Sequence, residues 1–335
     1  MEVSSVFRSP KGPTREEERD MGRLRIKVKK KDGRDRPPAQ GTPPPVDPRA
    51  LEKSIGEIHR LMEGKKFNSI DEANAFLQEA LSPGKPLDAP PRTPLEKAQE
   101  VMYRAWDATG RKRTDLARKA LGISADCADA YVLLAEETAR SLEEAMGLYE
   151  QGVKAGERAL GAQAFKDYEG DFWGILETRP YMPARAGLAE CLWMLGRREE
   201  AIAHYTDMLR LNPNDNQGLR YLLAQHLVEE KKDEAFVKLL HQFPDEGGAS
   251  WLYTRALWAF RREGEGKKAN AFLREAAKVN RFVPAYLLGR KKLPDQMPAF
   301  IGWGDDSEAV EYAAEALDLW RNTEGALDWL NRTLS

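Results

Sequence analysis

The stretch Leu188–Asp215 reads LAECLWMLGRREEAIAHYTDMLRLNPND and predicts two helices that pack against each other. Leucines at helical spacing form the packing stripe of the first helix, and Gly196 marks the bend that follows it. Ala201 supplies a small side chain where the second helix crosses the first, and Pro213 ends that helix because proline cannot continue it. The stretch therefore indicates one complete helical hairpin, which begins near Met182.

The features of this hairpin return at a fixed spacing along the chain. One small position and one apolar position recur every 34 residues, as Ala201, Ala235 and Ala269 and as Tyr205, Leu239 and Leu273. A period of about 34 residues is that of tetratricopeptide repeats, which stack because a single repeat cannot bury its apolar face. We therefore predict an all-α fold, a tetratricopeptide-like right-handed helical solenoid with a concave surface, and a role in binding.

The rest of the chain divides by composition. We expect a disordered basic and proline-rich tail (1–47), a short helical hairpin module (48–82), a proline-rich linker (83–94) and the solenoid (95–335). Two interruptions of the period, at 158–181 and 284–306, are expected inside the solenoid.

Capping residues predict several helix ends. Ser69 and Glu72 form the pattern of a capping box, in which each satisfies a free backbone amide of the other. Asp306 is expected to cap a helix that runs to Trp320. A terminal helix is expected over Thr323–Leu330.

Composition favours a soluble helical protein, with 41% apolar and 32% charged residues. No apolar run approaches the roughly 18 residues that cross a bilayer, and the first 30 residues lack the apolar core of a signal peptide. Cys127 and Cys191 are expected to be small buried groups in a reducing compartment rather than a disulfide or zinc pair. These features predict a cytoplasmic protein with no membrane association.

Charge is nearly balanced over the chain, with a net value of −2, but it is uneven along it. A basic cluster in the tail, opposed only by Asp32 and Asp35, consists of Arg23, Arg25, Lys27, Lys29, Lys30, Lys31, Arg34 and Arg36. We expect any nucleic-acid binding to use this basic cluster only, because the rest of the chain offers no general attraction to phosphates.

Patterns that support catalysis are absent from the sequence. The histidines His59, His204, His226 and His241 are scattered, and none has a second His or Cys at ligand spacing. Asp305, Asp306 and Glu308 are adjacent, and we interpret them as acidic residues that complement a helix dipole rather than as metal ligands. We therefore expect no catalytic residues, no metal and no cofactor.

The concave face is the candidate binding site. The first helices of the regular repeats are expected to line this groove through Glu190, Trp193, Arg220, Tyr221, Trp251, Arg255 and Trp258. Arginine and aromatic side chains together suit an extended peptide that carries a carboxylate. As alternatives, Trp193 and Trp258 pack between helices, and Arg220 and Arg255 form ion pairs within the solenoid.

Several blocks carry a family resemblance that goes beyond a generic repeat, and two of them lie outside the ordinary repeat consensus. They are ADAYVLLAEE (Ala128–Glu137), VKAGE (Val153–Glu157), CLWMLGR (Cys191–Arg197), VPAYLL (Val283–Leu288), DSEAV (Asp306–Val310) and EGAL (Glu324–Leu327). In order and spacing, over roughly residues 95–333, the chain resembles the suppressor of tumorigenicity 7 family as a soluble, bacterial-type member. The resemblance implies a tetratricopeptide-like solenoid with no recognised enzymatic activity. It also implies amino-terminal membrane-spanning helices in animal members, where this chain has its basic tail.

Three hypotheses of function follow. The first is a non-catalytic adaptor or scaffold that binds a protein or peptide partner in its groove. The second is a nucleic-acid- or ribosome-associated factor that is anchored by the basic cluster, although this cluster lacks interleaved aromatic residues for base stacking. The third is an enzyme whose site lies in the two interruptions.

Overall fold

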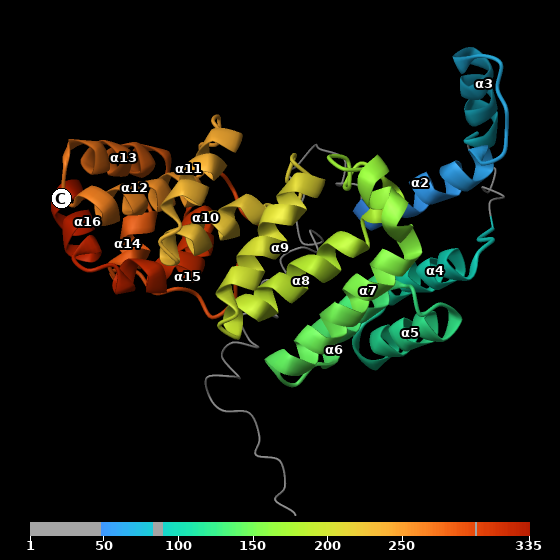
Figure 1. The fold of residues 1–335 in the computed structure, drawn as a ribbon, viewed down its shortest axis with the longest axis horizontal. Helices are drawn as coiled ribbons and strands as arrows, with labels where there is room; N and C mark the ends of the chain where they lie inside the picture. The colour runs from blue at the N-terminus through green and yellow to red at the C-terminus, as the bar shows by residue number, and fades with distance from the viewer. Residues whose placement is uncertain (1–47, 83–89, 299) are drawn as a thin grey trace, which may run out of the picture. The chain divides into compact units, whose positions relative to one another are not determined.

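The structure, a computed structural model, describes residues 48–82, 90–298 and 300–335, and the predicted tail with its basic cluster lies outside this part of the chain (Figure 1). Within the described residues every regular element is a helix, which confirms the all-α class. These residues form two compact units, one composed of 48–167 and 174–197 and the other of 168–173 and 198–335.

The first unit is a series of helices in which α4 to α8 contact one another in succession, and α2 contacts α4. Its elements are α2 (Pro48–Met62), α3 (Ile70–Ala80), α4 (Pro94–Asp107), α5 (Gly110–Ile123), α6 (Ala128–Thr138), α7 (Leu142–Asp167), the 3-10 helix η1 (Leu176–Thr178) and α8 (Tyr181–Met194). Helices α4 to α8 bury their apolar faces in this stack, whereas α3 has no buried residue. Helices α2 and α3 fall within the predicted module 48–82, and their pairing as a hairpin stays a prediction.

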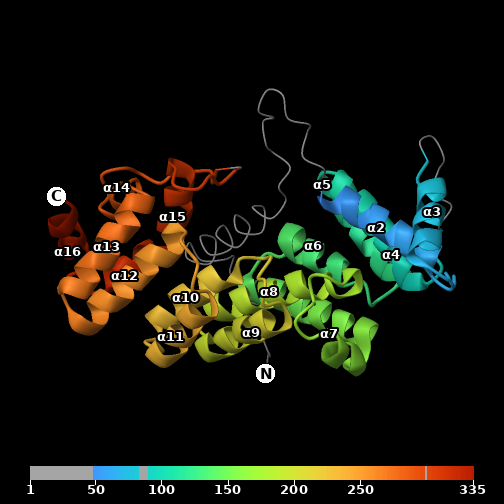
Figure 2. The ribbon, with the colours of Figure 1, turned by 90° about the horizontal axis from the view of Figure 1, so that it is seen from above.

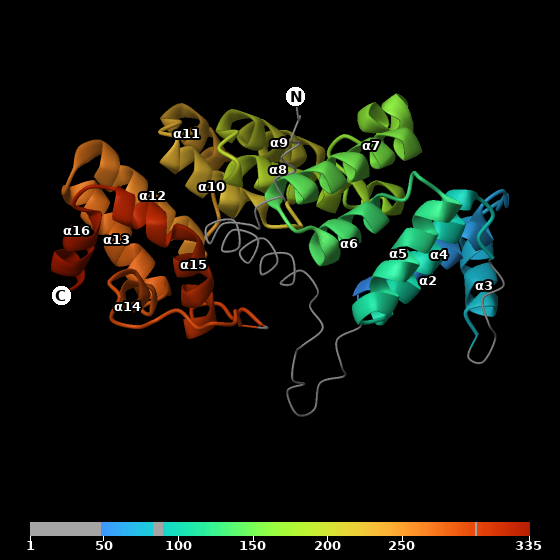
Figure 3. The same ribbon diagram turned by 90° about the horizontal axis from the view of Figure 1, so that it is seen from below.

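The first helix of the second unit is also the second helix of the predicted hairpin at Leu188–Asp215. Its helices are α9 (Arg198–Leu211), α10 (Leu219–Glu229), α11 (Asp233–Gln242), α12 (Ala249–Glu263), α13 (Lys267–Val279), α14 (Val283–Leu287), α15 (Asp306–Asn322) and α16 (Ala326–Leu334). Helices α12 and α13 run side by side in all three views, and α15 and α16 pack against α12 at the carboxyl-terminal end (Figures 1, 2 and 3).

The repeat period is visible in the burial of the second helices. Tyr205, Leu239 and Leu273 are all buried, as their shared spacing predicts. Ala201 and Ala269 are fully buried, but Ala235 is exposed, so the expectation of a small crossing residue is wrong at this position. Ala235 is exposed because α11 buries the next residue, Phe236, and therefore directs the Ala235 side chain to solvent.

The two interruptions differ in form. The first holds the end of α7, which breaks at Gly161 where φ is 71°, and then turns through η1 to α8. Phe165 packs edge-on against Tyr181 at 5.1 Å between ring centroids. The second interruption contains the short helix α14 and a loop that runs to α15. We name this segment, residues 289–298 and 300–305, the Trp303 loop.

Two predicted caps need correction. Ser69 accepts a hydrogen bond from the Glu72 N–H at 3.1 Å, but the Glu72 carboxylate accepts from the Asn68 N–H, so the capping box is only half formed. Asp305, not Asp306, is the N-cap of α15, because its side chain accepts from the N–H groups of the first turn. This helix also continues past Trp320 to Asn322, and α16 begins only at Ala326.

In the part of the chain that the structure describes, no helix combines the length and the apolar character needed to cross a membrane.

Candidate binding sites

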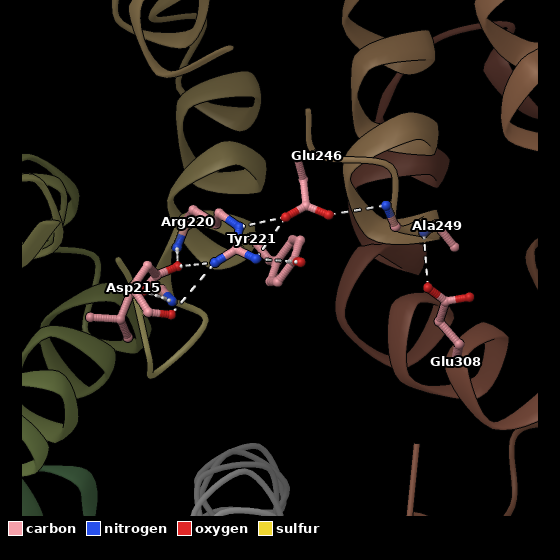
Figure 4. A network of polar contacts seen from close by, with 8 residues as sticks. Asp215, Arg220, Tyr221, Glu246, Ala249 and Glu308 are labelled. Carbon is pink, nitrogen blue, oxygen red and sulfur yellow. Dashed lines mark hydrogen bonds and ion pairs between the residues drawn. The ribbon is translucent and has the colours of Figure 1, made fainter. Parts of the chain in front are cut away.

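Arg220 lies at the centre of a network of charged groups in the second unit (Figure 4). Asp215 adopts a positive φ of 47° in the turn before α10, and this conformation directs its carboxylate back to the helix. The carboxylate accepts from the N–H groups of Leu219 at 2.7 Å and Arg220 at 2.9 Å. The Arg220 guanidinium completes the pair through Nη1 at 2.9 Å. Asp215 therefore caps α10 and holds Arg220 at the same time.

The network continues from Arg220 to the start of α12. The Arg220 Nε donates to Glu246 at 2.8 Å, and the other oxygen of Glu246 accepts from the Gly248 N–H at 3.0 Å. The next amide, that of Ala249, donates to Glu308 of α15 at 3.0 Å (Figure 4). Two carboxylates thus occupy the N-terminus of α12, where the helix dipole favours negative charge.

Burial and hydrogen bonding act in opposite directions on these two carboxyl groups. Burial raises the pKa of Asp215 above its usual value, although the Arg220 and Leu219 amides and the Arg220 charge oppose this effect. Burial also acts to raise the pKa of Glu246, but hydrogen bonds from Gly248 and Arg220 outweigh it and hold this pKa below its usual value. The two pKa values shift in opposite directions because Asp215 is the more deeply buried group. Only 1% of the Asp215 side chain is exposed, against 9% for Glu246.

Aromatic rings surround the same guanidinium. Its carbon lies 4.4 Å from the ring centroid of Tyr221 and 5.3 Å from that of Phe243. Trp251 packs edge-on against both rings. The structure therefore brings together the predicted groove residues Arg220, Tyr221 and Trp251. Arg220 is already bound by two carboxylates of its own unit. That arrangement matches the alternative in which Arg220 forms an internal ion pair.

Arg255 and Trp258 of α12 have different neighbours. Arg255 donates to Glu275 of α13 at 2.7 Å and lies over the ring of Phe272. Trp258 is buried, and its indole N–H donates to Asp233 of α11 at 3.0 Å. Both contacts fit the packing alternatives for these residues.

The remaining two groove residues, Glu190 and Trp193, are buried on α8 in the first unit. Four of the seven side chains named for the groove are thus buried, and peptide binding by the set stays a prediction.

The second interruption contains an open surface depression. Tyr286 of α14 donates to Asp306 of α15 at 2.9 Å, and Lys291 binds the other oxygen of Asp306 at 2.6 Å. The depression beside this contact, the α14–α15 depression, has a volume of about 540 Å³. It is lined by Tyr286, Lys291, Lys292, Pro294, Pro298, Asp305, Asp306, Ser307 and Val310. Two of the family-like blocks, VPAYLL and DSEAV, therefore meet at its wall.

Trp303 precedes the lining residue Asp305 by two positions and is exposed, with 74% of its surface accessible. The backbone on either side is fixed, because the Gly302 N–H donates to Ser307 at 2.9 Å and the Gly304 N–H donates to Glu308 at 2.8 Å. A Cβ on Gly248 would lie 3.0 Å from the ring, so Trp303 extends over the turn before α12. The aromatic ring is thus presented to solvent on a backbone that the first turn of α15 holds in place.

The three adjacent carboxylates that could suggest a metal are each engaged by donors from the protein. Asp305 accepts from Ser307 and Glu308 as the cap of α15, and Asp306 binds Tyr286 and Lys291. Glu308 accepts from three separate donors, the Ala249 and Gly304 N–H groups and the Asn280 amide. Among the described residues no group of three or more His, Cys, Asp or Glu side chains could hold a metal ion.

The sequence did not predict the roles of three residues in the polar network. These residues are Asp215, Glu246 and Glu308. A signal existed for Asp215, because Asn-Pro-Asn-Asp is a turn sequence in which an aspartate often caps the following helix. No signal existed for Glu246 and Glu308, whose bonds to the α12 N-terminus depend on how α12 and α15 pack.

Comparison with known proteins relates the chain to one named group. A family model described as ST7 protein matches residues 91–224. The chain is similar to the Suppressor of tumorigenicity 7 protein-like of Rattus norvegicus, at 31% identity over 264 residues that cover 71% of this chain and 47% of the relative. The protein of the same name from Homo sapiens is 31% identical over 262 residues, which are 71% of this chain and 45% of that protein. Protein ST7 homolog of Drosophila melanogaster is 29% identical over 258 residues, 70% of this chain and 48% of its own length. The chain spans about half the length of the curated relatives it matches.

Proposed function

The chain belongs to the suppressor of tumorigenicity 7 family, and we propose that it is a non-catalytic helical adaptor or scaffold that binds a protein or peptide partner. The relatives' names state no enzymatic activity. We further propose that it works in the cytoplasm as a tetratricopeptide-like protein, a proposal supported by two buried cysteine thiols that remain free.

The observation that carries the adaptor proposal is the exposure of Trp303. Tryptophan is strongly enriched at the energetic centres of protein interfaces, where its large ring fills a pocket of the partner. Most aromatic side chains named for the groove are buried, whereas this one stands in solvent on a fixed backbone. We therefore propose the Trp303 loop, rather than the row of first helices, as the main contact with the partner.

A co-purification experiment tests this function. The tagged full chain is compared with Trp303→Ser and with Ile70→Ser, a control that removes an equally exposed apolar side chain from α3. We expect wild type and the Ile70→Ser control to retain one set of protein partners. The Trp303→Ser variant should lose them, since truncation of a central tryptophan costs about 2 kcal/mol or more, roughly 30-fold in affinity. Equal recovery by all three proteins, or no protein enriched by wild type, would refute the proposal.

The alternative function, association with nucleic acid or ribosomes, rests on the basic cluster. Neutralisation of several phosphates by about eight cations gives a binding constant that falls steeply with salt. If this alternative holds, replacement of Lys29, Lys30 and Lys31 by Glu in the full chain abolishes RNA recovery and leaves protein recovery intact. RNA recovery that survives this change would exclude it.

A further inference from the structure

A stretch of chain that leads into the Trp303 loop carries charges of a single sign. Every ionised side chain between Ala276 and Pro294 is a cation, namely Lys278, Arg281, Arg290, Lys291 and Lys292. Glu275 and Asp295 bound this run on either side. The run ends at the α14–α15 depression, where Lys291 and Lys292 form part of the lining.

Three of the five cations, Lys278, Arg281 and Lys292, form no ion pair in the described part of the chain, and Arg281 lies over the ring of its neighbour Phe282. Lys291 is engaged by Asp306, and Arg290 donates to the side chain of Asn331. Lys278 and Lys292 are exposed, and neither forms an ion pair with a carboxylate in the described part of the chain. A carboxylate brought by a partner would therefore displace only water from them.

Exposed apolar side chains lie in the same segments of the chain as these cations. Val279, next to Lys278, is 38% exposed, and its carbonyl oxygen would lie 3.0 Å from a Cβ on Gly304. Phe300 is 45% exposed in the Trp303 loop. Val279, Phe300 and Trp303, together with the α14–α15 depression, make up what we call the Trp303 surface.

The chemistry of the depression favours a peptide over a nucleic acid. Pro294, Pro298 and Val310 give it apolar walls that suit an aliphatic or aromatic side chain. Asp305 and Asp306 also line it and would repel any anion that entered it, whether a phosphate or a carboxylate. In a peptide, an apolar side chain can enter the depression while acidic residues on either side remain outside, near the cations.

We propose that the Trp303 surface binds an extended acidic peptide segment of a partner protein, with an apolar side chain in the α14–α15 depression and carboxylates facing Lys278 and Lys292. This inference rests on the proposed adaptor function and names the chemical class of the partner. Complementary charge at the rim of such an interface contributes to the rate of association and to selectivity between partners.

Fluorescence anisotropy with the full chain tests the proposal directly. The probes are labelled short peptides in which Leu and Gly are combined with Glu, with Gln or with Lys, and a labelled oligouridylate. We expect the Glu peptide to bind most tightly, with an affinity that falls as salt is added. The Lys278→Glu, Lys292→Glu double variant should weaken this binding roughly tenfold, because two exposed ion pairs of about 0.7 kcal/mol each are reversed. Lys119→Glu, an exposed lysine of α5, is the matched control and should change nothing.

The outcomes separate the two proposals. Equal affinity for the Glu and Gln peptides, or no binding of the Glu peptide while Trp303-dependent partner recovery persists, would overturn the acidic partner and leave the adaptor function standing. Binding of oligouridylate alone, weakened by the double variant, would replace the peptide with a nucleic acid. If Trp303→Ser changed neither peptide binding nor partner recovery, the adaptor proposal itself would fail.

Discussion

The hydroxyl of Tyr286 donates a hydrogen bond of 2.9 Å to the carboxylate of Asp306 and so joins α14 to the first turn of α15. Lys291 binds the same carboxylate, and this contact raises the pKa of the Lys291 ammonium. The wall of the α14–α15 depression is thus fixed by a contact between two segments that are separated by a loop rich in helix breakers.

Loss of this hydroxyl should loosen the wall. Tyr286→Phe removes the bond to Asp306 and is expected to lower the free energy of unfolding by about 1 kcal/mol. Urea denaturation followed by circular dichroism measures the change, with Tyr168→Phe as the control because Tyr168 is partly exposed in the same unit. An unchanged urea midpoint for Tyr286→Phe would show that the bond contributes nothing to the fold.

Gly187 is required in the first unit because of its contact with Tyr149. A Cβ at this position would lie 2.2 Å from the buried Tyr149 ring, so Gly187→Ala should destabilise the protein by about 1–3 kcal/mol. Gly147→Ala is the matched control on α7, where a Cβ meets nothing within 4 Å, and alanine should stabilise the helix by about 0.5–1 kcal/mol. Thermal melts that shift in the same direction for both variants would contradict this packing.

The ion pair at Arg220 predicts a pH-dependent loss of stability. Arg220→Ala leaves the buried Asp215 carboxylate without its cation, at a cost of roughly 3 kcal/mol near pH 7. The pKa of Asp215 in the folded state is already raised above 3.8, and removal of Arg220 raises it further. The folded state then holds the Asp215 proton more tightly than the unfolded state, so the cost is smallest below pH 3.8 and grows as pH rises through the folded-state pKa.

Denaturation of Arg220→Ala over a range of pH measures this slope. Addition of Asp215→Asn should remove the extra pH dependence, because no titrating group remains at that position. Arg118→Ala, which breaks an exposed pair with Asp115, should cost no more than about 1 kcal/mol. An Arg220→Ala penalty that is the same at low and neutral pH would show that Asp215 does not titrate as described.

The two thiols should be unreactive in the folded protein. Both cysteines are fully buried, and burial raises the pKa of Cys127 to about 12 and that of Cys191 well above its usual value. Because the thiolate is the reactive form, a disulfide reagent at pH 8 should label neither until denaturant is added. An Ile70→Cys variant supplies an exposed thiol that should react at once. Prompt labelling of the unmodified folded chain would place a cysteine at the surface.

Periodicity predicted the elements of this fold better than their contacts. The spacing of Tyr205, Leu239 and Leu273 depends only on which face of a helix packs, so it was visible in the sequence. The exposure of Ala235 was not, because neighbouring Phe236 competes for the same buried position. Asp305 and Asp306 are both good caps, and only the geometry of the loop decides between them.

The candidate site was harder to predict for a related reason. Helical position alone marked Arg220 and Trp258 as facing a groove, but their partners Asp215, Glu246 and Asp233 come from other segments of the chain. A sequence pattern cannot show whether a distant carboxylate already occupies an arginine. The exposed position of Trp303 likewise depends on hydrogen bonds that the loop backbone donates to Ser307 and Glu308.

The most direct measurement of partner contact at the Trp303 loop is site-specific photo-crosslinking in cells that produce the full chain. A benzophenone amino acid, which keeps a large aromatic side chain at the position, replaces Trp303 in one protein and Ile70, the most exposed large apolar residue of α3, in another. We expect position 303 to crosslink to a partner protein through a peptide rich in Asp and Glu, and position 70 not to crosslink to it. Crosslinks to the same partner only from position 70, or none from position 303, would contradict this expectation.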